Sequence, residues 1–314
     1  MKTLDDYDFS KFDYNKKYHL HVDFDTPIFS CAATVSKDEC IATLKTTGKS
    51  RVFENFDTFV DFLNTSELGK KYTIKDFNVN VVGFAIHNLN NKLDDIIDHD
   101  WVSDYTLYVG GKNNFRKDIY PEYKGNRAKS PAMRSVLFGY VVNRYKDKVV
   151  VSDGDEAEDE CLSTVLSDIE NNVCGYCDKD LTTQSAFFLN YQKMSRGVFF
   201  IDKTQAFYNL CCQILHGDKT DHIFGITHIS KELKDKYGIK TKSIGARTAE
   251  KLLEDVQHDK ILMKERVIEV YKLSFGDSWK DRLQFTGSLV FISKNKGEYF
   301  DIDKFTKGVQ YETT

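Results

Sequence analysis

Three segments of this sequence that are predicted to form β-strands run directly into carboxylate side chains. The segments 18–23 (YHLHVD), 148–153 (KVVVSD) and 173–177 (VCGYC) lead into Asp23, into the acidic run 155–160 and into the pair Asp178 and Asp180. Helical spacing of apolar residues separates these strands, and this alternation predicts an α/β fold whose central sheet is mostly parallel and flanked by helices. Because ligands of such sheets bind at the carboxyl ends of the strands, we expect the acids to meet in one crevice.

Further segments extend the alternation of strands and helices. Apolar residues at helical spacing predict helices over 86–97, 158–170 and 203–215, and β-prone runs predict a strand over 105–111 and a hairpin over 40–54. The continuous apolar run at 148–153 is typical of a strand that is buried on both faces. Residues 283–292 are compatible with a strand or with a core helix.

Length and composition favour a folded protein in a reducing compartment. A chain of 314 residues can form one large α/β domain, or a main domain with a small appendage. Seven cysteines, an odd number without the spacing of a disulfide framework, predict free buried thiols. No apolar run approaches the roughly 18 residues of a membrane span, and the N-terminus is too charged for a secretory signal. These features predict a cytoplasmic protein without a membrane partner.

Charge is distributed unevenly along the chain, although the net charge is only −4. Residues 112–148 contain ten Lys and Arg against three acids, whereas residues 153–180 contain ten acids against one lysine. A basic segment beside an acidic one suits an enzyme that cleaves phosphodiesters, because cations bind the phosphates and carboxylates hold the metal ion. The alternative interpretation is that both runs are solvated surfaces.

The acids are numerous enough to hold two hard divalent ions. Mg²⁺ and Mn²⁺ take oxygen ligands, and two such ions about 3.5 to 4 Å apart require several carboxylates at one place. The predicted helix over 203–215 delivers Asp218 and Asp221 in addition to the acids that follow the strands. The alternative for each single aspartate is a role as a turn former or as a helix N-cap.

Five short elements occur in an order that resembles one known family. They are PEYKGNR at 121–127, DEAEDE at 155–160, CDKD at 177–180, GDKTDHIFGI at 217–226 and SIGARTAEKLL at 243–253. Together they resemble the 5′ nucleases of bacteriophages, the 5′-3′ exonuclease and flap endonuclease family, which is related to phage ribonuclease H and to the 5′-nuclease domain of bacterial DNA polymerase I. The resemblance implies a PIN-like nuclease fold with a helical arch and an embedded helix-turn-helix that binds duplex DNA.

The resemblance also implies roles for individual residues. The two divalent ions, Mg²⁺ or Mn²⁺, would be held or oriented by Asp23, Glu156, Glu158, Asp159, Asp178, Asp180, Asp218 and Asp221. Lys124 and Arg127 would contact the scissile phosphate, and Tyr123 would stack on a terminal base. Further DNA contacts would come from Arg116, Lys129, Arg134, Ser243, Gly245, Arg247 and Thr248. In related enzymes a K⁺ ion is bound at the helix-turn-helix.

By the same resemblance the chain divides into three parts. They are a nuclease core at 1–216 with a helical arch at about 112–145, a duplex-binding element similar to a helix-hairpin-helix at 217–258, and a C-terminal helical region at 259–314. The implied activity is metal-dependent hydrolysis of DNA from or near 5′ ends, at flaps or nicks, and of RNA primers in RNA–DNA hybrids. We expect a monomer in the cytoplasm, which is the host cytoplasm if a phage encodes the chain.

Two departures from the family pattern leave alternatives open. The family has an aspartate after its second core strand, whereas this chain has no acid between Asp104 and Asp118, and Asp25 is a candidate substitute. A Lys-rich insertion at 226–242 enlarges the duplex-binding element or docks a partner. A non-catalytic protein that binds DNA ends or junctions is therefore one alternative, and an endonuclease that acts on RNA is another.

Overall fold

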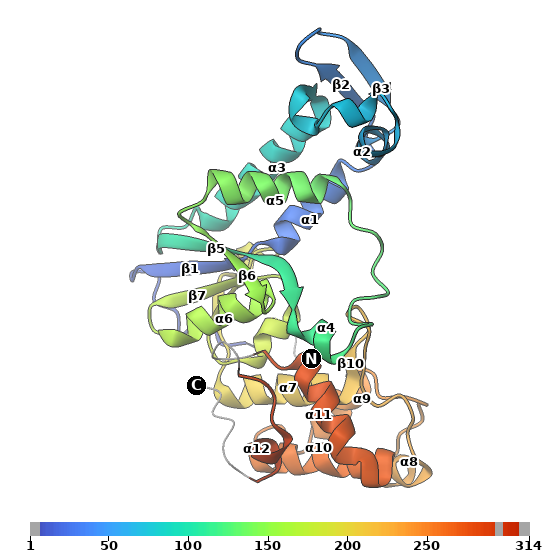
Figure 1. Ribbon diagram of the computed structural model, residues 1–314. Helices are drawn as coiled ribbons and strands as arrows, with labels where there is room; N and C mark the ends of the chain where they lie inside the picture. The colour runs from blue at the N-terminus through green and yellow to red at the C-terminus, as the bar shows by residue number, and fades with distance from the viewer. Residues whose placement is uncertain (1–6, 293–297, 308–314) are drawn as a thin grey trace.

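A mostly parallel sheet of six strands forms the centre of the computed structural model, which describes residues 7–292 and 298–307 (Figure 1). The strands lie in the spatial order β6, β5, β1, β7, β8, β9, and only β9 is antiparallel to its neighbour. Their bounds are Tyr18–Asp23 (β1), Val102–Asn114 (β5), Val149–Gly154 (β6), Asn172–Tyr176 (β7), Phe187–Asn190 (β8) and Val198–Phe200 (β9). The predicted α/β class with a mostly parallel sheet is confirmed.

Strand β1 is central, and its alternation separates apolar from polar side chains. Leu20 and Val22 are fully buried on one face, whereas His21 and Asp23 point to the other face, as the two-residue period of a strand requires. Asp23 is paired with Tyr108 of β5 at the end of the strand. Because the neighbouring strands are parallel, their carboxyl ends lie at the same edge of the sheet as Asp23.

Strand β6 lies at the edge of the sheet, so the prediction that it is buried on both faces is wrong. Only β5 flanks it, Val149 and Val150 are partly buried, and Val151 is 43 % exposed. Valine favours the extended backbone whether or not it is buried. A run of valines therefore predicts a strand but does not say where in the sheet the strand lies.

Helices cover both faces of the sheet. On one face α1 (Asp25–Thr34), α3 (Asn80–Ile97) and α5 (Met133–Arg144) pack against one another and against the apolar side chains of β1. On the other face α6 (Ala157–Ser167) packs on β1, β5 and β7, together with the chain that follows β7. The helix predicted over 86–97 is confirmed within α3, and the helix predicted over 158–170 is confirmed as α6, which ends at Ser167.

A small appendage projects from the α1 and α3 layer (Figure 1). Strands β2 (Cys40–Leu44), β3 (Ser50–Phe53) and β4 (Phe77–Val79) form a separate antiparallel sheet, next to α2 (Phe56–Thr65) and the short helices η2 (Gly69–Lys71) and η3 (Ile74–Asp76). The hairpin predicted over 40–54 is confirmed. Its turn contains Gly48 at a φ of 68°, a left-handed conformation that glycine adopts readily.

The basic segment after β5 is helical only at its two ends, which corrects the prediction of a helical arch at 112–145. Helix α4 (Phe115–Ile119) is short, and residues 120–132 form an irregular loop between α4 and α5. Pro121 and Pro131 stand near the two ends of this loop and disfavour a continuous helix. The loop runs from the α5 layer to the C-terminal half of the molecule (Figure 1).

The C-terminal half forms a second core around α7, whose residues 205–215 are all buried. The elements are α7 (Lys203–His216), β10 (Gly217–Asp218), β11 (Ile223–Phe224), α8 (Lys231–Tyr237), α9 (Ala246–Leu253), α10 (Lys260–Phe275), α11 (Trp279–Val290) and α12 (Ile302–Thr306). The helix predicted over 203–215 is confirmed, and residues 283–290 are helical rather than extended. The predicted boundary after residue 216 falls within this core, because α7 packs on α9, α10 and α11.

Parts of the predicted regions lie outside the described residues, namely 1–6 of the core and 293–297 and 308–314 of the C-terminal region. All seven cysteines lie in the described part, and they are free, six of them buried, as predicted. Among the described helices none is both long enough and apolar enough to cross a membrane.

Candidate functional site

Carboxyl groups from four separate stretches of the chain gather at the carboxyl edge of the sheet. We call them the acidic cluster: Asp23 at the end of β1, Glu156 and Glu158 at the start of α6, Asp178 and Asp180 beside η4 (Lys179–Thr183), and Asp218 and Asp221 after α7. Asp178 interacts electrostatically with Asp23, with Glu158 and with Asp180. The structure thus brings together seven of the eight predicted metal ligands, although their positions in the sequence span some two hundred residues.

The acidic cluster holds more negative charge than its surroundings compensate. Burial, followed by the charges of Asp25 and Asp178, raises the pKa of Asp23 to about 7. Burial and neighbouring carboxylates also raise the pKa of Glu158 and of Asp180 well above their usual range. Shifts in this direction arise where carboxylates are desolvated and held close to one another. A cation bound among these groups would relieve both effects.

Two basic residues of the PEYKGNR segment lie against the acidic cluster. Lys124 forms an ion pair with Glu156 and its Nζ lies 3.5 Å from Asp221 Oδ2, while Arg127 forms an ion pair with Asp221. Burial opposes ionisation of Glu156, but Lys124 and Arg116 outweigh it and lower the pKa of Glu156 to about 2. The predicted phosphate contacts, Lys124 and Arg127, therefore lie beside the predicted metal ligands.

Tyr123 holds the PEYKGNR segment against the acidic cluster. Its hydroxyl lies 2.8 Å from Glu156 Oε2 and 3.0 Å from Asp221 Oδ2, and its ring is only 3 % exposed within the second core. This burial corrects the prediction that Tyr123 stacks on a terminal base, because no base can reach the ring. The next residue, Lys124, has a φ of 58° and donates its backbone N–H to Asp221 O at 2.9 Å. A left-handed lysine costs conformational energy, so the surrounding contacts must hold it in place.

Two further residues of the site were not predicted from the sequence. Lys179 Nζ lies 3.3 Å from Asp218 Oδ2. Burial raises the pKa of Asp218, but the positive charge of Lys179 and backbone hydrogen bonds outweigh burial and lower it. Gln213 of α7 donates its side-chain amide to Asp180. The position of Lys179 inside the CDKD element could have indicated its role. Nothing in the sequence distinguishes Gln213 from the other buried residues of α7.

Arg116 and Asp159 form a buried ion pair, which corrects the predicted role of Arg116. Arg116 Nη1 and Nη2 donate to the two carboxylate oxygens of Asp159 at 2.6 and 2.9 Å, and Arg116 is 1 % exposed. The prediction that Arg116 contacts DNA is wrong, because no phosphate can reach the guanidinium. Asp159 Oδ2 also accepts from the backbone N–H of Glu156 at 3.1 Å, so this carboxylate fixes the start of α6 instead of facing the acidic cluster.

The donor set of the acidic cluster fits hard divalent ions, but its side chains are not yet in a coordinating arrangement. Within residues 7–292 and 298–307, no three Asp, Glu, His or Cys side chains lie close enough to hold a metal ion as they stand. Ion pairs with Lys124, Arg127 and Lys179 occupy oxygens of three carboxylates of the cluster, those of Glu156, Asp221 and Asp218. Carboxylates in excess over these three cations are the ligands that Mg²⁺ and Mn²⁺ prefer.

Asp25 lies where a side chain at Gly110 would lie. The backbone N–H of Gly110 donates to Asp25 Oδ2 at 3.1 Å, and a Cβ atom at position 110 would be 2.7 Å from the same oxygen. Arg134 Nη2 lies 3.4 Å from Asp25 Oδ1. Strand β5 has no acid of its own at this edge, but α1 places a carboxylate at the same point.

The predicted duplex-binding element consists of α8, a turn and α9. Ser243, Gly245 and Arg247 are exposed and Thr248 is partly exposed, so all four can be reached by a ligand. Gly245 is the N-cap of α9 and makes no side-chain cap, which leaves amide groups at the helix start free to bind an anion. Of the other predicted DNA contacts, Lys129 is exposed in the loop 120–132 and Arg134 is partly exposed on α5.

The Lys-rich insertion at 226–242 contains α8 and is attached to α10. Tyr237 donates its hydroxyl to Glu269 at 2.5 Å, and Lys236 forms an ion pair with the same carboxylate. Arg266 of α10 lies over the Tyr237 ring. These contacts hold α8 against the C-terminal helix α10.

His19 and His21 stack on each other with their ring centroids 4.4 Å apart. His19 Nε2 lies 2.8 Å from Thr106 Oγ1, and His21 Nδ1 lies 3.0 Å from the Tyr108 hydroxyl. Burial, followed by the charge of His19, lowers the pKa of His21 to about 4, so this imidazole is neutral near pH 7. These contacts give both histidines a packing role beside the sheet.

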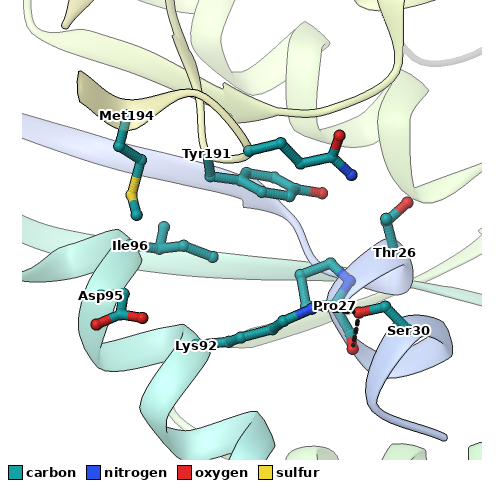
Figure 2. Close-up of a pocket in the computed structure, with 9 residues that line it drawn as sticks. Thr26, Pro27, Ser30, Lys92, Asp95, Ile96, Tyr191 and Met194 are labelled. Carbon is teal, nitrogen blue, oxygen red and sulfur yellow. Dashed lines mark hydrogen bonds between the residues drawn. The ribbon is translucent and has the colours of Figure 1, made fainter. Parts of the chain in front are cut away.

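A cavity of about 290 Å³ lies between α1, α3 and the chain after β8 (Figure 2). The hydroxyl of Tyr191, which lines it, donates to the backbone oxygen of Asp23 at 3.0 Å. Lys92 Nζ donates to Ser30 Oγ at 2.6 Å, and Asp95 lines the same cavity. Because a cation and a carboxylate share the lining, its charge points to no class of ligand, and we assign it none.

Comparison with known proteins identifies similar structures but no matching family model. No family model and no curated protein matches the sequence. Solved structures similar to this chain include the T5 5′-exonuclease with bound zinc, at 17 % identity over 92 % of this chain and 96 % of that chain, with a TM-score of 0.35. The catalytic core of Rad2 in complex with a DNA substrate is 11 % identical over 95 % of this chain and 82 % of that chain, with a TM-score of 0.39. TM-scores of this size leave the functional argument to the motifs and to the geometry of the site.

The raised pKa of Asp23 predicts that the metal-free protein loses stability as the pH rises. The usual pKa of 3.8 applies to the unfolded chain and about 7 to the folded one. Between these values the unfolded chain gives up its proton first, so the free energy of unfolding falls with rising pH and stays low above pH 7. A shift of this size corresponds to on the order of 4 kcal/mol.

Thermal unfolding in EDTA at about pH 5.5 and about pH 8 measures this effect. We expect the Tm to be lower at the higher pH by roughly 5 °C or more. Asp23→Asn should remove part of the difference, because the raised pKa values of Glu158 and Asp180 contribute to it as well. Mg²⁺ or Mn²⁺ should raise the Tm more at the higher pH, because metal binding displaces the proton. An equal pH dependence in wild type and Asp23→Asn would show that Asp23 is not the group that titrates.

Proposed function

We propose that this chain hydrolyses phosphodiester bonds of DNA from or near 5′ ends, as a divalent-metal-dependent 5′-3′ exonuclease and flap endonuclease. The observation that carries the proposal is the acidic cluster at the edge of the sheet, lying under a loop that presents Lys124 and Arg127. Metal-binding carboxylates next to phosphate-binding cations are the two parts that such hydrolysis requires. The order of the five sequence elements supports the same activity.

The residues of the site divide into those that bind metal and those that bind phosphate. Two ions of Mg²⁺ or Mn²⁺ would supply a water molecule of lowered pKa and would neutralise charge on the phosphate. Asp23, Glu158, Asp178 and Asp180, together with the other acids of the cluster, would hold these ions through their oxygens. Lys124 and Arg127 would leave their carboxylate partners and bind the non-bridging and leaving oxygens of the scissile phosphate. Tyr123 would keep Glu156 and Asp221 in place during this exchange.

Two surfaces would bind the rest of the nucleic acid. The loop 120–132, with Lys129 in it and Arg134 beyond it, would contact the phosphates of a single-stranded 5′ end. The turn before α9, with Ser243, Gly245, Arg247 and Thr248, would receive a phosphate of the duplex at the helix start, with a K⁺ ion at the same turn. DNA with 5′ flaps or nicks and RNA primers in hybrids would fit both surfaces. Binding is therefore expected to weaken steeply with salt.

Asp25 is proposed to take the place of the carboxylate that β5 lacks. Gly110→Ala is then expected to lower the cleavage rate about tenfold or more, as changes to groups that orient metal ligands do. The new methyl group would displace the Asp25 carboxylate, which lies 2.7 Å from the Cβ position. Single-turnover cleavage at saturating Mg²⁺ measures the effect. Gly83→Ala in α3, where a Cβ meets nothing within 4 Å, is the matched control. Equal cleavage rates for the two variants would show that Asp25 does not contribute to metal binding.

A second candidate function is non-catalytic binding of DNA ends or junctions. The observation that favours it is the set of ion pairs from Lys124, Arg127 and Lys179, which neutralise part of the acidic cluster without metal. A protein of this kind would bind flapped DNA without cutting it, and its affinity for Mn²⁺ would be low. Cleavage assays therefore separate the two candidates.

The dependence on a 5′ end is tested with paired substrates. A duplex with a single-stranded 5′ flap and a covalently closed single-stranded circle of the same sequence are incubated with the protein in Mg²⁺, and products are resolved on denaturing gels. The proposal predicts cutting of the flapped duplex and little cutting of the circle. Equal cutting of both would indicate a nuclease without end preference. A single-stranded RNA of the same sequence is tested in parallel, and faster cutting of this RNA than of the DNA would favour an endonuclease that acts on RNA.

A further inference from the structure

Every N–H group of the Arg116 guanidinium has an acceptor, although the side chain is almost fully buried. Nε donates to the backbone oxygen of Leu289 at 2.9 Å. Nη1 donates to Glu156 at 3.3 Å and to Asp159 at 2.6 Å, and Nη2 donates to Asp159 at 2.9 Å and to the backbone oxygen of Phe291 at 3.1 Å. An arginine side chain has five N–H donors, so these five contacts use its full capacity.

The five contacts join three parts of the molecule that are remote in sequence. Arg116 belongs to α4, the carboxylates belong to the start of α6, and the two carbonyl groups lie at the end of α11. On the other side of this C-terminal stretch, Gln184 donates its side-chain amide to Ile292 O at 2.8 Å. Gln184 directly follows η4, which carries Asp180. Through Arg116 and Gln184, the stretch 289–292 is therefore linked to two of the segments that supply carboxylates to the acidic cluster.

We propose that Arg116 is a positioning residue for the acidic cluster and that residues 289–292 are the fixed point against which it acts. The proposal deepens the proposed nuclease function and rests on it. Arg116 sets the orientation of Glu156, which lies in the cluster, and locks the first turn of α6 through Asp159. Gln184 holds the η4 side against the same stretch. The planar fork that serves three carboxylate oxygens and two carbonyl groups at once is specific to arginine, since lysine offers a point charge with three donors.

Arg266 offers a matched control elsewhere in the chain. Its Nη1 and Nη2 donate to the two oxygens of Asp255 at 3.0 and 2.9 Å, and Nη1 also donates to the backbone oxygen of Leu252 at 2.6 Å. The same fork thus joins a carboxylate and a carbonyl group, but Asp255 is not part of the acidic cluster. A change to lysine disturbs local packing at both arginines, and only Arg116 is placed to affect metal binding.

The test compares Arg116→Lys, Arg266→Lys and wild type in two measurements. The first is Mn²⁺ binding to the free protein by calorimetry, which needs no catalysis, and the second is single-turnover cleavage of a 5′-flapped duplex at saturating protein. We expect Arg116→Lys to bind Mn²⁺ about 10–100-fold more weakly and to cleave more slowly by a similar factor, as is typical when a group that orients a metal ligand is changed. Arg266→Lys should match wild type in Mn²⁺ binding, the measurement that involves no DNA. Thermal unfolding of each variant establishes that it is folded at the assay temperature.

Each outcome decides for or against the positioning role. Folded Arg116→Lys with the Mn²⁺ affinity and cleavage rate of wild type would overturn it, and so would equal losses in Arg116→Lys and Arg266→Lys. If Arg116→Lys is unfolded, Gln184→Met takes its place: weakened Mn²⁺ binding supports the fixed point at 289–292, and unchanged binding overturns it. Wild type that binds Mn²⁺ but cuts no DNA would contradict the nuclease function alone, because the binding comparison between variants still stands.

Discussion

Asp178→Asn is expected to abolish cleavage while DNA binding persists. Asp178 lies near several members of the acidic cluster, because its charge affects Asp23, Glu158 and Asp180. Asparagine keeps the shape of the side chain but removes its charge, which a divalent ion requires. The single-turnover rate on a 5′-flapped duplex should fall by at least about 10²–10³-fold, the loss seen when one electrostatic stabiliser of a transition state is removed.

The same variant should bind flapped DNA as tightly as wild type when Ca²⁺ replaces Mg²⁺, as measured by fluorescence anisotropy. Asp168→Asn is the matched control, because Asp168 lies at the end of α6 and its side chain accepts from Asn171 rather than facing the cluster. A rate for Asp178→Asn within a few-fold of the Asp168→Asn rate would contradict the placement of Asp178 among the metal ligands.

Lys124→Ala is expected to change metal binding and cleavage in opposite directions. Without DNA, Lys124 pairs with Glu156 and lies near Asp221, so its removal frees carboxylate oxygens and should strengthen Mn²⁺ binding. With DNA, the same lysine would stabilise charge on the phosphate, so cleavage should fall by about 10²-fold or more. Calorimetry with Mn²⁺ and single-turnover cleavage in Mg²⁺ measure the two effects on one protein.

Lys117→Ala provides the comparison, since Lys117 is an exposed residue of α4 that forms no contact with the acidic cluster. We expect it to leave both quantities close to those of wild type. Weaker Mn²⁺ binding by Lys124→Ala would show that the lysine supports metal binding instead of competing with the metal ion for carboxylate oxygens. Unimpaired cleavage would show that Lys124 does not bind the scissile phosphate.

The sheet and the convergence of its acids could be predicted from the sequence because both follow from local patterns. Tyr18–Asp23 alternates as a strand should and ends at an aspartate, and its bounds match β1. Parallel strands carry their carboxyl ends to one edge, so Asp178 and Asp180 after β7 had to approach Asp23. The position of the Asp25 carboxylate at the same edge was also foreseeable, because Asp25 stands only two residues after Asp23.

The remainder depends on tertiary contacts that no local pattern encodes. Arg116 looks like one more cation of a basic segment, and only the end of α11, more than 170 residues away in sequence, makes it a buried residue. Tyr123 could serve equally well as a stacking surface until the second core covers its ring. The loop 120–132 was predicted as part of a helical arch by resemblance, although its two prolines favour an irregular backbone.

The most direct test of the proposed function is a time course of cleavage with a 5′-flapped, 3′-labelled DNA duplex in Mg²⁺, with parallel reactions in EDTA and in Mn²⁺. The acidic cluster and its neighbouring cations predict products shortened from the 5′ side in Mg²⁺ and Mn²⁺ and intact substrate in EDTA. Tight binding of the duplex without cleavage in either metal would contradict the nuclease function and would identify the chain as a DNA-end or junction-binding protein.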